Sequence, residues 1–415
     1  MPARTHARAL AATALLAAPL PVVALTSSPA DAGDGPLASS VALDWQRTAL
    51  KVMSVDTTPA PGPPVMAMYL SFTSLAVHDA AREAQRYGTH AAAAAVATAA
   101  HDVLWAYFPG GAARSRIDAQ LSDSLAEVPD GKKEDAGVEI GAAAADRMIA
   151  SRVGDGRFDS SVVYSKTPAA GIWQPPATGM ALAWFAFLRP VVDVPTVQLD
   201  GPDPLGSPEY TTDYNEVKRI GSATALPADR SPEQTTISRF MNGTPSVSVV
   251  VMYREALIRH LQAEPMGLIP TTRLFARLDA ATVEAFRQTW RLKYDIGFWR
   301  PFQAIAGAAT DGNDDTEPQD NWTPLIPNPA YSDYTSGHAA VTAPFAEILR
   351  HTLGEDTELE LRLAGFDDRT YADLSALEHD AFMARIWGGL HFRDAMDDGY
   401  LLGHTVAHEV MSEIK

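Results

Sequence analysis

Three separated segments in the last third of the chain contain residue types that can bind a small anion. The first holds Lys293 and Arg300, the second is Ser-Gly-His at 336–338, and the third holds Arg385 and His391. Together they supply three cations, a hydroxyl, a glycine amide and two imidazoles. A tetrahedral oxyanion removed from water needs such a set, because each oxygen accepts hydrogen bonds and the negative charge requires fixed cations nearby.

The first segment places its two cations seven positions apart, which is two helical turns if the helix continues to Pro301. Proline cannot continue the hydrogen-bonded ladder, so we expect Arg300 at a bend that faces a pocket. Two solvated surface charges are the simpler explanation of this spacing taken alone. The aromatic neighbours Trp290 and Tyr294 argue against a solvated face.

The second segment offers the Ser336 hydroxyl and the Gly337 amide as donors. Glycine permits a close backbone approach or a φ value that other residues resist. His338 is predicted to begin a helix over 339–353, which places both donors at a helix N-terminus, where anions are favoured. Taken alone, the segment is equally typical of an ordinary helix start.

In the third segment Arg385 ends a predicted helix over 370–386, and Gly388 and Gly389 interrupt the chain. His391 then opens the last predicted helix, over 392–414. A capping or core histidine is the alternative for His391 alone.

In their order and internal spacing, these segments resemble the superfamily of vanadium-dependent haloperoxidases and type 2 phosphatidic acid phosphatases, in its secreted bacterial haloperoxidase-like branch. The resemblance is close over 290–403 and looser elsewhere. It implies a vanadate cofactor, with phosphate as a competing occupant of the same site. The residues that it implies as anion ligands are Lys293, Arg300, Ser336, Gly337, Arg385 and His391.

The resemblance also implies roles. His391 would bond to the vanadium of vanadate, His338 would act as general acid–base, and Lys293 would share in catalysis by polarising the bound group. The implied reaction is oxidation of a halide by hydrogen peroxide to hypohalous acid. The alternative is a secreted acid phosphatase, in which His391 attacks the phosphorus of a small phosphate substrate and forms a phosphohistidine. Trp290 and Tyr331 stand where haloperoxidases place aromatic residues around the halide, although ordinary core packing is the simpler explanation.

Three positions depart from the family pattern. Ala384 replaces a serine that need not touch the anion, and Thr335 replaces a proline. The third departure is Ala395, where the family has a carboxylate that orients the axial imidazole and raises its basicity. The carboxylates that could replace it are Asp394, Asp397 and Asp398.

Composition limits the other classes of function. The net charge of −18 argues against nucleic acid or an anionic membrane as partner. Arg4 and Arg8 precede an apolar run over 9–25 and small residues at 30–32, which predicts a signal peptide over 1–32 and a secreted, extracellular protein that is not inserted in the membrane. An uncleaved membrane anchor is the alternative. The chain has no cysteine, so disulfides cannot stabilise it.

The predicted fold is all-α, with two packed helical bundles, long loops and the oxyanion site in the C-terminal bundle. Further helices are predicted over 66–87, 91–108, 112–126, 133–149, 231–241, 246–261 and 268–294, with an irregular stretch over 154–210. We expect an N-terminal helical region over 33–265 and a catalytic bundle over 266–415.

His404 and His408, one turn apart, have no evident third metal ligand and are expected on a solvent-facing helix. The sequence leaves the oligomeric state open.

Overall fold

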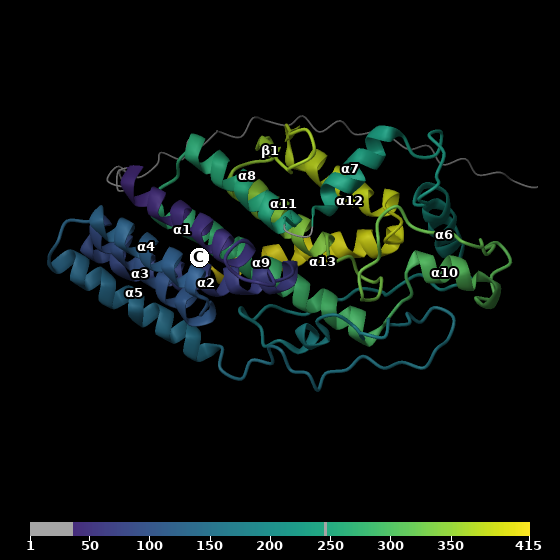
Figure 1. Cartoon of the computed structure of the whole chain (residues 1–415), viewed down its shortest axis with the longest axis horizontal. Coiled ribbons are helices and arrows are strands. Elements are labelled where there is room, and N and C mark those ends of the chain that lie inside the picture. The colour runs from purple at the N-terminus through teal and green to yellow at the C-terminus, as the bar shows by residue number, and fades with distance from the viewer. Residues whose placement is uncertain (1–35, 245–246) are drawn as a thin grey trace, which may run out of the picture. The chain divides into compact units, whose positions relative to one another are not determined.

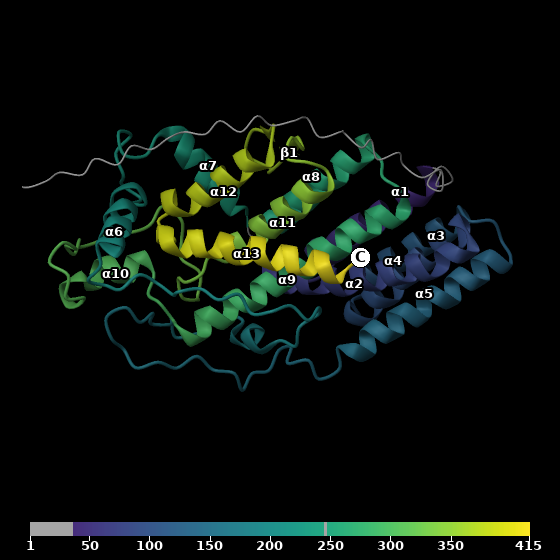
Figure 2. The ribbon, with the colours of Figure 1, turned by 180° about the vertical axis from the view of Figure 1, so that it is seen from behind.

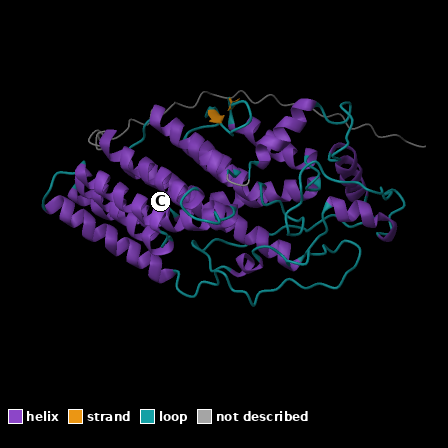
Figure 3. Ribbon diagram, viewed as in Figure 1, coloured by secondary structure: helices purple, strands orange, loops and turns teal. Residues whose placement is uncertain are grey.

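Helices form nearly all the regular structure of the chain (Figure 3). The computed structural model describes residues 36–244 and 247–415, so the expected signal peptide over 1–32 lies outside the described residues. Within those ranges the only sheet is an antiparallel pair, β1 (Leu359–Leu361) with β2 (Arg369–Tyr371). The all-α prediction is confirmed.

Five helices form the N-terminal half of the structure (Figure 1). They are α1 (Pro36–Ser54), α2 (Pro63–Ala84), α3 (Thr89–Tyr107), α4 (Gly111–Ala126) and α5 (Lys132–Ser151), with a short 3-10 turn η2 (Gln85–Tyr87) after α2. Alanine and glycine set how closely two of them, α3 and α5, approach. A Cβ atom at Gly137 would lie 2.3 Å from the Ala91 carbonyl oxygen, and one at Gly141 would lie 2.5 Å from that of Ala95. The backbones of α3 and α5 therefore touch, which larger residues at these positions would prevent.

The C-terminal half is arranged around α9 (Leu268–Asp295), which packs against α2, α11 and α13 (Figure 2). The other elements are α6 (Pro208–Ile220), α7 (Pro232–Asn242), α8 (Val249–Ala263), α10 (Pro301–Gly307), the 3-10 turn η4 (Ala308–Thr310), α11 (Ala339–Thr352), α12 (Leu374–Trp387) and α13 (Arg393–Glu413). Residues 34–415 form one compact unit in which α1 and α2 contact α9. The boundary expected at residue 266 stays a prediction.

A long irregular segment between α5 and α6, with one 3-10 turn η3 (Ala183–Phe187), runs along one side of α9 (Figure 3). Buried polar side chains of α9 hold its backbone: Glu284 accepts a hydrogen bond from the Val191 amide (2.6 Å), and Gln288 accepts one from the Val197 amide (2.9 Å). Gln288 also donates to the Pro195 carbonyl (3.1 Å). The segment thereby covers the part of α9 that leads to Lys293.

Some helix predictions were wrong in their limits. α1, α6 and α10 were not predicted, and the helix expected over 370–386 begins only at Leu374, because residues 369–371 form β2 and the Asp373 side chain accepts a hydrogen bond from the Ala376 amide. The helix that carries Lys293 does not continue to Pro301: α9 ends at Asp295. No helix of the described residues is long and apolar enough to cross a membrane.

Candidate active site

The three segments meet through hydrogen bonds made by the two cations of the first. Lys293, in the last turn of α9, donates from Nζ to the backbone carbonyls of Ser332 and Asp333, each at 2.8 Å. Arg300, immediately before α10, donates from Nε to the Tyr331 carbonyl and from Nη1 to the Leu390 carbonyl, each at 2.7 Å. Both side chains are fully buried. The first segment therefore fixes the loops that carry the second and the third.

Arg385 enters from the last turn of α12, where it is also buried. Its Nη1 donates to the Asn242 side-chain oxygen at the end of α7 (3.3 Å). Beside it, the hydroxyl of Ser238 donates to the Ala384 carbonyl (2.8 Å), so α7 holds the end of α12 in place. The expectation that Arg385 ends its helix and that a Gly-Gly pair follows is confirmed.

Two of the donors in this cluster have no protein partner. Arg300 Nη2 and Arg385 Nε are buried, and no hydrogen-bond acceptor in the described part of the chain contacts either atom. An unsatisfied buried donor is costly, more so when it is charged. Two free guanidinium N–H groups beside a third cation are the donor set that a multiply charged oxyanion would satisfy, so the residues present fit vanadate or phosphate.

Burial and mutual repulsion alter how these groups titrate. Desolvation, followed by the repulsion of Arg300, places the pKa of Lys293 well below its ordinary value, although Asp333 opposes the shift. Desolvation likewise lowers the pKa of Arg385 to about 9. Bringing these cations together without a compensating charge costs electrostatic free energy, and a bound anion would lower that cost.

The second segment forms the start of α11. The Ser336 amide donates to the Ala395 carbonyl of α13 (2.9 Å), and the Ser336 hydroxyl oxygen accepts weak hydrogen bonds from the amides of His338 and Ala339, at 3.3 and 3.4 Å. The hydroxyl hydrogen stays free to be donated. Among the described residues the Gly337 amide donates to no backbone carbonyl, and its missing side chain faces the Trp290 ring. Both expected donors therefore lie at a helix N-terminus.

The two imidazoles of the site are held in the neutral form. Burial, then the charge of Arg385, places the pKa of His338 well below its ordinary value, and the Met241 carbonyl opposes that shift by accepting a hydrogen bond. Burial, then the charges of Arg300 and Lys293, does the same for His391. A neutral imidazole has a free electron pair on one nitrogen, which is what a proton acceptor or a ligand to a metal centre requires.

The carboxylate beside His391 is Asp333, which sequence reasoning missed. Asp333 is fully buried, and its Oδ1 lies 2.8 Å from His391 Nδ1, although the two groups are not aligned for a linear hydrogen bond. Burial raises the pKa of Asp333 to about 7, against the opposing charges of Arg300 and Lys293. A single aspartate in a loop, far in sequence from His391, has no spacing that would have identified it.

The aspartates expected to replace the missing carboxylate at Ala395 have other partners. Asp394 accepts a hydrogen bond from the Asp203 amide (3.4 Å), Asp398 accepts one from the Tyr334 hydroxyl, and Asp397 is exposed. None of the ion pairs of the described residues joins any of the three to His391.

The two aromatic candidates lie together at the site. The Trp290 and Tyr331 rings are 5.0 Å apart, and the Tyr331 ring faces the Lys293 ammonium at 5.1 Å and the Arg300 guanidinium at 5.0 Å. These distances are those of cation–π contacts. Trp290 is buried and donates from Nε1 to the Ala181 carbonyl (3.2 Å). Tyr331 is partly exposed.

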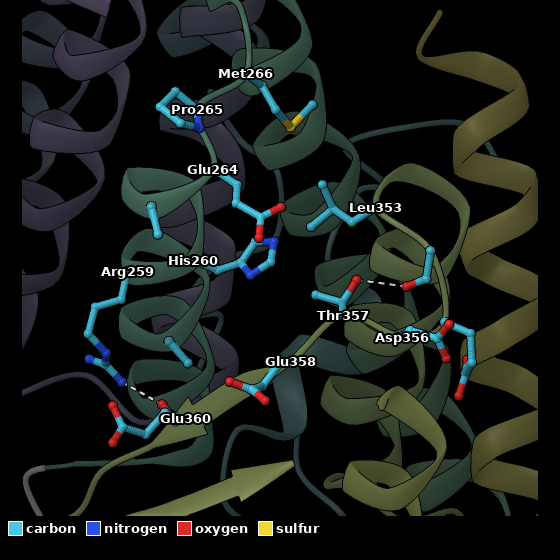
Figure 4. Close-up of a pocket in the computed structure, with 14 residues that line it drawn as sticks. Arg259, His260, Glu264, Pro265, Met266, Leu353, Asp356, Thr357, Glu358 and Glu360 are labelled. Carbon is cyan, nitrogen blue, oxygen red and sulfur yellow. Dashed lines mark hydrogen bonds between the residues drawn. The ribbon is translucent and has the colours of Figure 1, made fainter. Parts of the chain in front are cut away.

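A cavity of about 840 Å³ lies elsewhere (Figure 4). It is bounded by the end of α8 and the loop before β1, and the residues labelled there include His260, Glu264, Asp356 and Glu358. None of the oxyanion residues lines it. Its carboxylates would repel an anion, so it is not an extension of the site.

Comparisons with known proteins support the resemblance read from the three segments. Residues 273–415 match the family model of the VCPO second helical-bundle domain. That range contains all the cations and imidazoles of the three segments. The resemblance inferred from those segments, to the vanadium-dependent haloperoxidases, is confirmed.

Particular relatives agree in fold at low identity. The vanadium chloroperoxidase of Curvularia inaequalis is 25% identical over 177 residues, a match that covers 36% of this chain and 29% of the relative. The crystal structure of the first bacterial vanadium-dependent iodoperoxidase superposes with a TM-score of 0.71 at 19% identity, covering 91% of this chain and 96% of that one. An apo-type bacterial vanadium-dependent chloroperoxidase gives a TM-score of 0.64 at 15% identity, over 85% and 95%. At these identities the structural likeness shows the fold.

Proposed function

We propose that this protein is a vanadium-dependent haloperoxidase that uses hydrogen peroxide to oxidise a halide to hypohalous acid. One observation carries the proposal: Lys293, Arg300 and Arg385 converge in a buried site where two guanidinium N–H groups have no protein partner in the described chain. The fold and the family match of residues 273–415 support it.

Each residue has a chemical part in this proposal. Lys293, Arg300 and Arg385 would neutralise the bound oxyanion, and the Ser336 hydroxyl and the Gly337 amide would donate hydrogen bonds to it. His391 would hold the vanadate through its ring nitrogen Nε2. Bound vanadate would supply a Lewis-acidic centre at which peroxide is activated without a redox change of the metal.

His338 is the residue that would move a proton. Its imidazole stays neutral among the cations, so it could accept the proton that hydrogen peroxide loses on binding. Tyr331, beside Lys293 and Arg300, would contact the halide as it approaches.

The test uses the purified protein freed of phosphate and titrated with orthovanadate. Bromination of monochlorodimedone is followed with peroxide and bromide, beside hydrolysis of p-nitrophenyl phosphate without vanadate. We expect bromination that depends on vanadate and disappears in His391→Ala and in His338→Ala. Asp397→Asn, an exposed aspartate of α13, is the matched control and should keep full activity. Tight vanadate binding without oxidation of either bromide or iodide would contradict the proposal.

An acid phosphatase is the second candidate, and the position of Asp333 is the observation that favours it. A histidine nucleophile needs a group that orients its ring and supports its basicity, and a carboxylate oxygen 2.8 Å from Nδ1 is suited to this. Hydrolysis of p-nitrophenyl phosphate that vanadate inhibits, without bromination, would select this candidate.

A further inference from the structure

A buried carboxylate, Asp333, faces the His391 imidazole from an unexpected segment. Its Oδ1 is 2.8 Å from His391 Nδ1, and both side chains are nearly inaccessible to solvent. The position where the family has a carboxylate, four residues after the histidine, is occupied here by Ala395, which has no polar side-chain atom. Of the described acidic residues, Asp333 is the one that forms a close ion-pair contact with His391.

The backbone of Asp333 is anchored on both sides, which fixes the carboxylate beside the ring. Its amide donates to the Phe298 carbonyl (2.9 Å), and its own carbonyl accepts from Lys293 Nζ (2.8 Å). The carboxylate itself lies against His391, in the third segment. One residue therefore connects the Lys293 helix, the second segment and the third.

We propose that Asp333 is the positioning residue of His391: its carboxylate accepts a hydrogen bond from Nδ1–H, which keeps the proton on Nδ1 and leaves the Nε2 electron pair free for the bound oxyanion. The proposal rests on the proposed use of His391 as the vanadate ligand. A partner of this kind sets both the tautomer and the orientation of a ligating histidine, and its loss typically weakens metal binding by about 10- to 100-fold.

A different role for Asp333 predicts the opposite result. If the carboxylate only offsets the charges of Lys293 and Arg300, its removal makes the site more positive and tightens the binding of every anion. Sulfate separates the two roles, because it is bound by charge and hydrogen bonds alone, whereas vanadate also takes a bond from His391. Asp333→Asn and Asp333→Ala remove the same charge, but only the asparagine keeps an oxygen that can accept from Nδ1.

The first measurement is isothermal titration of the full-length protein with orthovanadate and with sulfate. In Asp333→Ala we expect vanadate affinity to fall by about 10- to 100-fold while sulfate affinity holds or rises. Asp333→Asn should recover part of the vanadate affinity. Asp394→Ala is the matched control, since this neighbouring aspartate bonds the Asp203 amide and not His391, and it should leave both affinities unchanged. Parallel tightening of vanadate and sulfate in both Asp333 variants would overturn the proposal.

The second measurement needs no bound anion and no turnover. Nitrogen-15 NMR of histidine-labelled protein reports which ring nitrogen carries the proton, and the spectrum of His391→Ala assigns the His391 signals. We expect the proton on Nδ1 in the wild-type protein, a mixture of tautomers in Asp333→Ala, and partial recovery in Asp333→Asn. An unchanged His391 tautomer in Asp333→Ala would overturn the proposal. If the wild-type protein bound no vanadate, the proposed function would fail, and the NMR result would still decide the role of Asp333.

Discussion

Arg300 is the residue on which the geometry of the site most depends. Its guanidinium donates to the Tyr331 and Leu390 carbonyls and retains one unpartnered nitrogen, Nη2. A planar fork with five donors can serve two loops and a ligand at the same time, and a lysine ammonium cannot reproduce that geometry. The charge of Arg300 is therefore only part of its contribution.

Arg300→Lys tests this point because it keeps the charge and removes the fork. We expect vanadate or sulfate affinity to fall by at least about 10-fold, since charge-assisted hydrogen bonds of this kind contribute roughly 1.5–3 kcal/mol. Isothermal titration calorimetry with each anion measures the change in affinity. Arg219→Lys, an exposed arginine paired with Asp229, is the control and should bind normally. Full affinity in Arg300→Lys would show that the charge alone is sufficient.

The residues of the site divide into those that sequence could identify and those that it could not. Lys293, Arg300 and Arg385 each lie in a short segment whose key residues are close together in the sequence. The sequence pattern alone could therefore identify them. Asp333 and Asn242 act on residues far from them in sequence, and their contacts exist only after the loops have folded. No local pattern distinguishes such residues from ordinary loop residues.

At the scale of elements, the turn between α12 and α13 decides where His391 lies. Gly389 has a φ of +72°, and a Cβ there would lie 2.4 Å from the Gly221 carbonyl oxygen and 2.9 Å from the Pro324 Cβ. The first of these contacts is with backbone at the end of α6, which cannot move aside. Glycine is required at this position by conformation and by space together.

Gly389→Ala should lower the free energy of unfolding by at least about 2 kcal/mol, because a left-handed backbone and a steric overlap each cost of order 1–3 kcal/mol. Gly312→Ala is the matched control: its φ is +76°, and nothing lies within 4 Å of the added Cβ. Urea unfolding of both variants separates the two costs, because Gly312→Ala carries only the cost of the left-handed backbone and Gly389→Ala carries the steric overlap as well. Equal destabilisation would mean that the turn tolerates the added methyl group.

The prediction of elements failed where tertiary contacts override local pattern. Leu268–Asp295 shows strong helical periodicity and was placed well, but the end of α9 before Arg300 was not foreseen. Gly297, at a φ of +64°, and the Tyr164 hydroxyl that occupies the space beside it terminate the helix there. Tyr164 belongs to the irregular segment, whose position no sequence periodicity indicates.

Three helices of the site are joined by one histidine on α13. His404 Nδ1 lies 3.0 Å from Glu347 on α11, and Nε2 lies 3.1 Å from Glu378 on α12. His408 and Arg350 face the same carboxylates: His408 contacts Glu347, and Arg350 contacts both. Burial lowers the pKa of His404, but the attraction of Glu378 and Glu347 outweighs it, and the net pKa is raised.

This raised pKa predicts a pH-dependent contribution to stability. A folded pKa above the unfolded value of about 6.5 means that the stabilisation is fully present below that pH and is lost as pH rises through the folded pKa. The melting temperature of His404→Gln should therefore lie furthest below wild type under mildly acidic conditions, and the gap should close at higher pH. A gap that widens with pH would contradict the assignment. His351→Gln, which changes an exposed histidine of α11, is the control.

At the scale of the whole molecule, the chain is acidic overall but its buried candidate site is cationic. The chain carries a net charge of −18, yet Lys293, Arg300 and Arg385 lie together in its interior. The folded state holds these cations close together at a cost, which the unfolded chain avoids. A bound oxyanion removes part of that cost only in the folded state.

Anion binding should consequently stabilise the whole fold. By mass action, vanadate at one hundred times its dissociation constant adds about 2.7 kcal/mol to the free energy of unfolding. The phosphate-free protein should melt at a lower temperature than the protein with vanadate, and the shift should grow with the logarithm of vanadate concentration. Arg385→Ala, which removes one cation and one of the two unpartnered donors, should lose most of this shift. A shift that survives in Arg385→Ala would place the anion elsewhere on the molecule, whereas its loss would tie the stability of the fold to occupation of this site.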